Sequence, residues 1–243
     1  MLRSTILATI LLLPLPARAG CLIALDIGHY AEAPGEISAR GVPELVYNIA
    51  LTERVKAALD RAEIAAVVIN AHGDIAELAQ RPRRAQAAGA SLLVSLHHDS
   101  VQDGYKSTWE WKGAYRAYSD VFSGFGLFVS GRNPAVAESL KVAEDLGDGL
   151  TAAGLSPSLH HAEAIPGENR PLLDVGRGIY RFDDLAVLRQ AAMPAVLVEA
   201  GIIVNRADEE VITSEPYRAV FAAAIAQAAA GHCRRLESKA AIQ

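Results

Sequence analysis

The chain has 243 residues, and 51% of them are hydrophobic. This length suits one ordinary α/β domain, or at most two small ones, and the apolar content is enough to bury a substantial core. The formal net charge of −5 supplies no basic field that would attract nucleic acid or an anionic membrane surface. Composition therefore indicates a globular domain and argues against a nucleic-acid partner.

The first 19 residues have the pattern of a secretory signal peptide. Arg3 is their only early charge, residues 6–13 form an apolar run, and Ala17-Arg18-Ala19 places small residues around a cleavage point. An N-terminal membrane anchor is the alternative, but a membrane span needs about 20 apolar residues. We therefore predict cleavage after Ala19 and a mature chain that is periplasmic or secreted, without a transmembrane segment.

The first half of the mature chain alternates strands with helices. Short apolar runs predict buried strands, and apolar positions that repeat with a helical period predict amphipathic helices. The predicted order is a strand at 22–26, a helix at 43–62, a strand at 65–70, a helix at 77–88 and a strand at 91–96. This alternation implies parallel pairing in an α/β sheet.

The second half of the chain is less regular. Residues 101–123 are aromatic and polar without a clear period, and residues 155–178 are typical of a long surface loop that lines a cleft. The other predicted elements are a strand at 125–129, a helix from Asn133-Pro134 to Gly154, a short helix at 183–190, a strand at 195–199 and a last helix from Ser214 to near His232. We treat residues 20–235 as one domain and residues 236–243 as a C-terminal tail that frays.

The chain contains two cysteines, Cys21 and Cys233. An exported protein meets an oxidising compartment, so a disulfide between them is predicted. The alternative is two unpaired thiols, because only geometry decides whether two cysteines pair. Lipidation of Cys21 is not expected, because Arg18 stands where a lipoprotein signal normally has an apolar residue.

Imidazole and carboxylate side chains follow the predicted parallel strands where each strand ends. His29 comes just after the first strand, His97 ends the third, and Glu199 ends the strand at 195–199. Glu44 lies in the first turn of the helix after the first strand. Open parallel sheets bind ligands beyond the carboxyl ends of their strands, so these side chains are predicted to meet at one edge.

Two imidazoles and one carboxylate form a catalytic zinc set that leaves a fourth position for water. We assign His29, Glu44 and His97 as the metal ligands. Zinc lowers the pKa of a bound water from about 15.7 to near 7, and an unligated carboxylate can then move the proton to a leaving amine. Glu199 is the candidate for this base, since a carboxylate that ends a buried strand is otherwise costly.

The same segments resemble the zinc-dependent N-acetylmuramoyl-L-alanine amidases of the Amidase-3 class. The resemblance spans most of residues 22–230, and its four motifs stand in the order and spacing of the family. They are LDIGHYAEAPG (25–35), GVPELVYNIAL (41–51), LAQRPRRAQAAGASLLVSLHHDS (78–100) and VLRQAAMPAVLVEAGIIVNRADE (187–209). The family pattern differs at Ile27, His98 and Asp99, which leaves the metal set intact.

Carried over residue by residue, the resemblance implies zinc ligands at His29, Glu44 and His97 and a catalytic carboxylate at Glu199. It implies a single α/β domain with a mixed, mostly parallel sheet of about six strands flanked by helices. The implied activity is hydrolysis of the amide between N-acetylmuramic acid and the L-alanine of the peptidoglycan stem peptide. A zinc peptidase acting within the stem peptide, or a non-catalytic wall-binding domain with the same fold, are the alternatives.

Several of these residues also have an ordinary structural interpretation. Glu44 can serve only as a favourable charge at a helix N-terminus, and Glu199 can pair with a buried arginine. His98 belongs to the cleft or the core, because neighbours in a strand face opposite sides and His97 is assigned to the metal. Asp26 either orients a ligating histidine or caps the loop.

Four further side chains stay open at this point. His160 and His161 lie in the proline-rich loop, where solvent exposure is the first expectation and substrate contact the second. Trp109 and Trp111 either stack on sugar rings or pack against the sheet.

Overall fold

The computed structural model describes residues 20–241, so the predicted signal peptide at 1–19 lies outside the described residues. The strands are β1 (Leu22–Ile27), β2 (Ala65–Ile69), β3 (Leu92–Asp99), β4 (Ser107–Trp111), β5 (Ala114–Tyr118), β6 (Gly126–Val129), β7 (Leu172–Asp174), β8 (Ile179–Arg181) and β9 (Ala195–Ile202). The helices are α1 (Glu44–Arg61), α2 (Gln80–Ala87), α3 (Val136–Ala152), α4 (Ala186–Arg189), α5 (Arg206–Ile212) and α6 (Glu215–Ala240), with 3₁₀ turns η1 (Asp103–Tyr105) and η2 (His160–Ala162).

A seven-stranded sheet in the order β2-β1-β3-β9-β6-β8-β7 forms the centre of the molecule. The pairings among β2, β1, β3 and β9 are parallel, as is β6 with β8, whereas β6 with β9 and β7 with β8 are antiparallel. The predicted mixed, mostly parallel sheet is therefore confirmed, with one strand more than expected. Two of the seven strands, β7 and β8, have no counterpart among the predicted strand ranges: the edge strand β7 lies inside the segment that was predicted to be a long surface loop, and β8 directly follows that segment.

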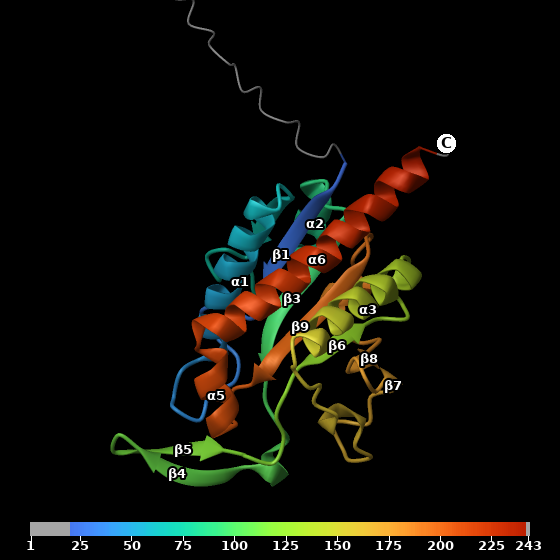
Figure 1. Cartoon of the computed structure of the whole chain (residues 1–243). Helices are drawn as coiled ribbons and strands as arrows, with labels where there is room; N and C mark the ends of the chain where they lie inside the picture. Colours follow the sequence, from blue (N-terminus) through green and yellow to red (C-terminus); the bar gives the residue numbers. More distant parts are fainter. Residues whose placement is uncertain (1–19, 242–243) are drawn as a thin grey trace, which may run out of the picture.

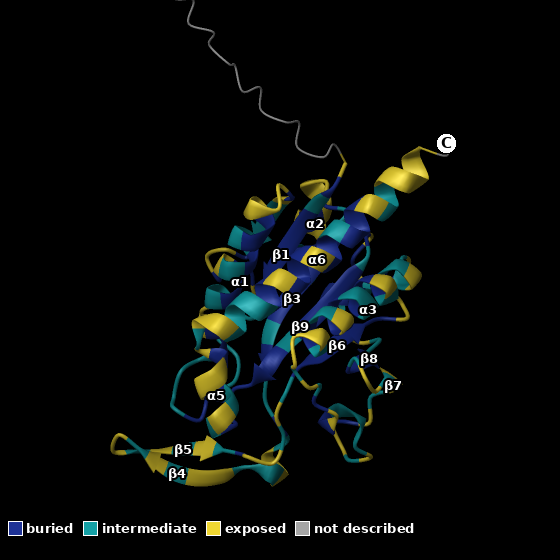
Figure 2. Ribbon diagram, viewed as in Figure 1, coloured by how far each residue is buried: buried dark blue, intermediate teal, exposed yellow. Residues whose placement is uncertain are grey.

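Helices cover both faces of the sheet (Figure 1). On one face α6 runs between α1 and α3 and packs on both, while α2 and α4 lie on the other face. Because side chains alternate along a strand, Val94 of β3 joins the core under α6 and Leu93 joins the core on the opposite side. Figure 2 shows most of the length of the central strands β1, β3 and β9 as buried between these layers.

The last helix is longer than expected. It was predicted to end near His232, but α6 continues to Ala240. The continuation is held to α3, where Arg235 donates hydrogen bonds to Glu138 at 2.6 Å and to Asp145 at 2.7 Å. These tertiary contacts stabilise a segment whose local sequence alone suggested a frayed tail.

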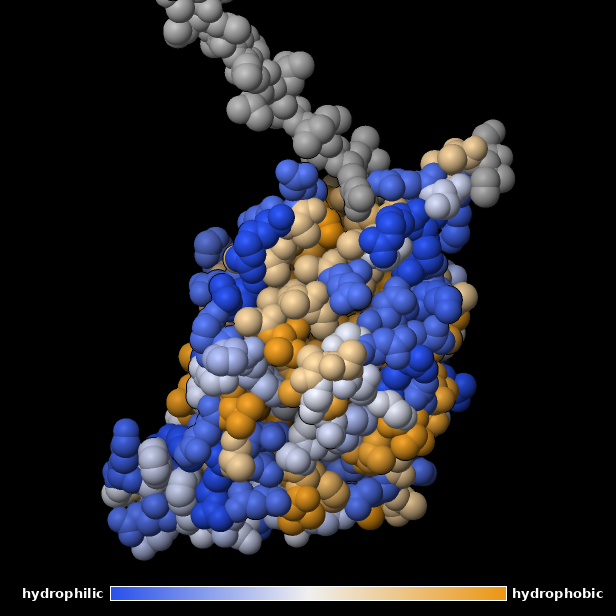
Figure 3. All heavy atoms as spheres, in the orientation of Figure 1, coloured by the Kyte–Doolittle hydropathy of each residue, from blue (hydrophilic) through white to orange (hydrophobic). Residues whose placement is uncertain are grey.

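The alanine-rich composition of α6 permits close helix packing. A Cβ atom added to Gly149 of α3 would lie 3.1 Å from the Cβ of Ala224, so the two helices approach closely at this point. Figure 3 shows the small apolar residues of α6 between hydrophilic neighbours. Within residues 20–241, α6 and the other helices lack a stretch both long and apolar enough to cross a membrane.

The predicted disulfide is confirmed. Cys21, just before β1, is bonded to Cys233 of α6, with a Cα–Cα distance of 5.5 Å. The bond joins the two ends of the domain across a sequence separation of 212 residues. It anchors α6 to the edge of the sheet from which β1 starts.

Residues 101–123, in which no clear period is visible from the sequence, contain regular structure. Strands β4 and β5 form an antiparallel hairpin that projects beyond the end of the main sheet, near α5 (Figure 1). Its turn is Lys112-Gly113, and both residues have positive φ, 49° and 77°. Two-residue hairpin turns favour this conformation, so Lys112-Gly113 was the local signal for the hairpin.

Candidate metal centre

Three neighbouring parallel strands bring the predicted residues to one edge of the sheet. In the register, Ile27 of β1 is beside Leu96 of β3, and His97 of β3 is beside Glu199 of β9. His29 lies two residues after the end of β1. The common direction of these strands places their carboxyl ends together, as predicted.

Glu44 lies between the two imidazoles. Its Oε2 is 2.7 Å from Nε2 of His29, and its Oε1 is 3.1 Å from Nδ1 of His97. The rings of His29 and His97 have centroids 5.0 Å apart, and the three potential ligand atoms lie within 4.8 Å of one another. The structure therefore brings the predicted metal set, His29, Glu44 and His97, into one cluster.

At two positions, Gly28 and Gly35, the backbone passes so close to the cluster that a side chain would collide with a ligating residue. A Cβ atom at Gly28 would lie 2.4 Å from the His97 ring, and one at Gly35 would lie 2.4 Å from Oε2 of Glu44. Two imidazoles and a carboxylate from a buried glutamate suit a borderline divalent cation such as zinc. The donor set and its close-fitting surroundings are therefore compatible with a bound ion.

The ordinary interpretation of Glu44 as an isolated charge at a helix N-terminus does not account for its contacts. Burial raises the pKa of Glu44, but hydrogen bonds and charge from His29 and His97 outweigh burial and hold the pKa well below its usual range. The carboxylate is therefore ionised, as a metal ligand must be.

Buried polar side chains fix the loop that carries His29. Asn70 donates hydrogen bonds to the carbonyls of Ile27 and His29, at 2.8 and 2.6 Å. Arg81, which is 1% exposed, also donates to both carbonyls. His29 has a φ of 67°, so these bonds hold a backbone conformation that histidine seldom adopts.

Asp26 supports the same region without contacting a ligating imidazole. Its carboxylate accepts a hydrogen bond from Ser95 Oγ at 2.7 Å and is 3.5 Å from Arg81. Of the two interpretations of Asp26, a structural role beside the loop is the one that its contacts favour.

His98 lies in the core rather than in the metal cluster. It is 4% exposed, and burial lowers its pKa to about 3. Its Nδ1 is 2.8 Å from Oδ1 of Asn48, whose Nδ2 donates to Oε1 of Glu44 at 3.1 Å. Asn48, which the sequence analysis did not single out, thus orients the carboxylate of Glu44.

Replacing Asn48 with alanine is expected to weaken zinc binding by about 10- to 100-fold, because the group that orients Glu44 is lost. Zinc titration of the purified variant measures this change. Asn133→Ala is the matched control, because Asn133 is also buried, and its side chain bonds to the carbonyls of residues 188, 191 and 193 and to the backbone N–H of Ala135, away from Glu44. Equal zinc affinity for the two variants would contradict the orienting role of Asn48.

Glu199 lies beside His97 and has no counter-ion of its own. Its Oε2 is buried without a hydrogen-bond partner, and among residues 20–241 no arginine pairs with it. Burial, and then the charges of Asp99 and Glu44, raise the pKa of Glu199 well above its usual value. The ordinary interpretation as an arginine partner is therefore wrong, and the carboxyl group is suited to exchange protons.

A cavity of about 220 Å³ lies beside Glu199. Its lining includes Gln102, Phe128, His161, Glu168, Arg170 and Glu199. Part of this wall comes from the segment 155–178, so the expectation that this segment lines a cleft is confirmed. The cavity gives the carboxyl group of Glu199 access to a ligand.

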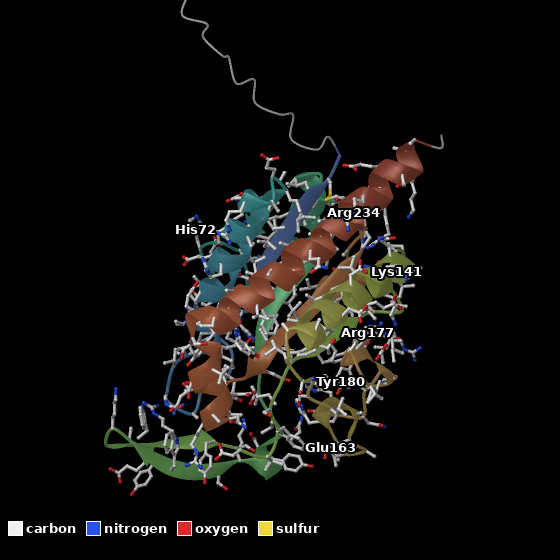
Figure 4. The ribbon with its side chains drawn as sticks, in the orientation of Figure 1. His72, Lys141, Glu163, Arg177, Tyr180 and Arg234 are labelled. Carbon is white, nitrogen blue, oxygen red and sulfur yellow. A yellow bond between two sulfur atoms is a disulfide. The ribbon has the colours of Figure 1, made fainter. Side chains whose placement is uncertain are left out.

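The remaining histidines differ from one another. His72 is exposed at the outer side of the molecule, beside α1 and outside the cluster (Figure 4). His160 and His161, in contrast, are 2% and 14% exposed, so their predicted solvent exposure is wrong. Both converge on Asp99, a contact that no local sequence pattern reveals.

The two tryptophans pack on the hairpin and on arginines. Their rings stack with centroids 5.2 Å apart, and the Trp109 Nε1 donates to the Ala39 carbonyl at 2.8 Å. Arg40 lies over both rings. Packing is therefore the observed role of Trp109 and Trp111, although it takes place on the hairpin and not on the main sheet.

Comparisons with known proteins are consistent with this arrangement. A family model described as N-acetylmuramoyl-L-alanine amidase matches residues 23–230. A probable N-acetylmuramoyl-L-alanine amidase AmiB of Haemophilus influenzae is 25% identical over 215 residues, covering 81% of this chain and 48% of that protein. The amidase AmiC of Neisseria meningitidis is 23% identical and covers 84% of this chain and 51% of that protein. The chain thus spans about half the length of these relatives.

Solved structures with the same fold are also similar to this chain. The amidase Ami1 of Mycobacterium smegmatis matches with a TM-score of 0.69 at 23% identity, covering 90% of this chain and 99% of that one. The catalytic domain of CwlV, from a Bacillus (Paenibacillus) polymyxa variety, matches with a TM-score of 0.65 at 22% identity, covering 88% and 98%. At this level of identity the structural likeness supports the fold.

Proposed function

Because the chain belongs to the N-acetylmuramoyl-L-alanine amidase family, we propose that it hydrolyses the amide bond between N-acetylmuramic acid and the L-alanine of the peptidoglycan stem peptide. We assign Zn²⁺ to His29, Glu44 and His97, and the role of catalytic base to Glu199. The observation that carries the proposal is the placement of Glu199 directly beside His97, next to a three-residue cluster of metal-binding donors.

A zinc ion held by this cluster supplies Lewis acidity toward the amide carbonyl and toward the attacking water. Glu199 accepts the proton that the water loses as its oxygen bonds to the carbonyl carbon. Glu199 then returns this proton to the amide nitrogen as the carbon–nitrogen bond breaks. The products are the lactyl carboxylic acid and the amine of L-alanine, and transfer of the acid's proton to the amine gives the carboxylate and ammonium forms. A raised pKa brings the carboxyl group nearer to the operating pH, where proton transfer in both directions is efficient.

We also propose that the protein acts outside the cytoplasm. The signal-peptide pattern at residues 1–19 and the Cys21–Cys233 disulfide support this location, since disulfides persist in oxidising compartments. The proposed catalytic domain, residues 20–235, contains all four assigned site residues.

Removal of the metal is expected to abolish cleavage, and added Zn²⁺ is expected to restore it. The reason is that the bound ion supplies the Lewis acidity that activates the attacking water. The measurement is mass spectrometry of purified peptidoglycan after digestion by the untreated, chelator-treated and zinc-restored protein. Intact stem peptides released only by the zinc-containing protein support the amidase assignment.

Two other outcomes of this digestion would contradict the proposal. Shortened stem peptides would identify a zinc peptidase that acts within the stem. Binding to peptidoglycan without any released product, at full zinc occupancy, would identify a non-catalytic wall-binding domain.

A further inference from the structure

A second group of metal-type donors lies outside the cluster assigned above. Asp99 ends β3, whereas His160 and His161 lie in η2, about sixty positions later in the chain. Oδ2 of Asp99 is 2.8 Å from Nε2 of His161 and 3.4 Å from Nε2 of His160. The three potential ligand atoms lie within 4.8 Å of one another, as do those of His29, Glu44 and His97.

Both histidines of this second cluster are held from behind through Nδ1. The Nδ1 of His160 is 2.8 Å from Ser158 Oγ, and the Nδ1 of His161 is 2.8 Å from Glu168 Oε2. Metal-binding histidines commonly bond their second nitrogen to a carboxylate or another polar group, which fixes the ring and frees the first nitrogen for the metal. Each Nε2 faces Asp99, as that arrangement requires.

The supporting residues are themselves fixed. Gln102 donates to Glu168 at 2.8 Å, and Tyr180, labelled in Figure 4, donates to the Ser158 carbonyl at 2.8 Å. The loop around η2 is thus held in place by the segment that follows β3 and by β8. The two imidazoles are therefore positioned before any ligand arrives.

One potential metal-ligand atom of this cluster makes no hydrogen bond within the described residues. His160 is 2% exposed, and its Nε2 has no hydrogen-bond partner. A buried polar atom without a partner is energetically costly. A ligand that binds both Nε2 of His160 and Oδ2 of Asp99, which are 3.4 Å apart, would remove this cost.

A proton on His161 is the metal-free alternative. Burial lowers the pKa of His161, but Asp99 and Glu168 outweigh burial and raise it to about 9. An imidazolium would satisfy both nitrogens of His161 and both carboxylates. It would still leave Nε2 of His160 without a partner, whereas one cation would bind all three side chains.

We propose that Asp99, His160 and His161 bind a second divalent transition-metal ion of the zinc class. Two imidazole nitrogens and one carboxylate oxygen are the donors that this class prefers. The ion links the end of β3 to the loop that carries His161 and Glu168, both of which line the cavity beside Glu199. Its role is to hold that wall of the cavity in place.

The test is the zinc content of the full protein after equilibration with Zn²⁺ alone and removal of weakly bound ions. We expect about two zinc ions per chain in the unaltered protein. The count falls to about one in His97→Ala and in the double variant His160→Ala/His161→Ala, and close to zero when all three changes are combined. His72→Ala, which removes an exposed histidine, is the matched control and retains the full count.

A conservative variant keeps the test valid where the double alanine variant does not fold. His161→Gln preserves a polar side chain and is made in the His97→Ala background, where Co²⁺ absorption reports the second site alone. Loss of the remaining visible cobalt bands on this change supports the proposal. Retention of those bands, or about one zinc ion in both the unaltered protein and the His160→Ala/His161→Ala variant, overturns it.

These outcomes separate the second site from the proposed activity. An unaltered protein that holds about one zinc ion, loses it in His97→Ala and still releases stem peptides would keep the amidase assignment and remove the second ion. Two zinc ions per chain with no release of stem peptides would support the second metal site and contradict the amidase assignment.

Discussion

Glu199→Gln is expected to lower the rate of peptidoglycan cleavage by about 10²- to 10⁴-fold while zinc content stays unchanged. Glutamine has nearly the same shape as glutamate but cannot accept the proton of the attacking water. Glu199 lies beside His97, and its buried Oε2 has no hydrogen-bond partner, so the change removes no ion pair. Turnover of purified peptidoglycan and metal analysis of the same sample measure the two quantities.

Glu53→Gln is the matched control for this substitution, because Glu53 is exposed on α1. It should retain both full turnover and full zinc content. Cleavage by Glu199→Gln at the rate of the control would rule out Glu199 as the base. Joint loss of zinc and turnover would instead assign Glu199 to metal binding.

The second large effect concerns the disulfide. The double variant Cys21→Ala/Cys233→Ala is expected to lower the free energy of unfolding by about 2–5 kcal/mol, toward the upper end of this range. The reason is the 212-residue separation of the cysteines, because a longer closed loop restricts the unfolded chain more strongly. Urea denaturation of the oxidised protein and of the variant gives the difference.

Reduction of the unaltered protein supplies the control. Dithiothreitol should shift its unfolding midpoint to that of Cys21→Ala/Cys233→Ala and leave the variant itself unchanged. Coincident midpoints for the oxidised protein and the variant would show that the bond contributes no stability. Zinc content should be retained in the variant, because the bond lies at the edge of the sheet opposite the metal centre.

The convergence of the metal cluster was predictable from the sequence. His29 and His97 stand at the ends of strands whose apolar runs are recognisable locally, and Glu44 begins the helix that follows the first of them. Parallel strands bring those ends to one edge. The same reasoning placed Glu199 there. The structure confirms that these side chains lie together, and their chemical roles remain proposals for the experiments above.

The residues that the sequence analysis missed depend on contacts that are distant in the chain. Asn48 is an unremarkable position in an amphipathic helix until the fold brings it against Glu44 and His98. In the sequence, His160 and His161 lie in a segment, residues 155–178, whose prolines, glycines and few apolar residues predict a solvated loop. Only the return of this loop toward β3 buries them against Asp99.

Local pattern determined strands β1, β2, β3, β6 and β9, most of the helices and the ligand types at the strand ends, because apolar period and capping residues act over a few neighbouring positions. Tertiary structure decided the length of α6, the pairing of Cys21 with Cys233 and the burial of His160 and His161. These features depend on which segments meet in space, and their energies come from long-range packing and ion pairs such as that of Arg235 with Glu138. A short stretch of sequence does not include the distant residue that its side chains contact in the fold, so it cannot predict that contact.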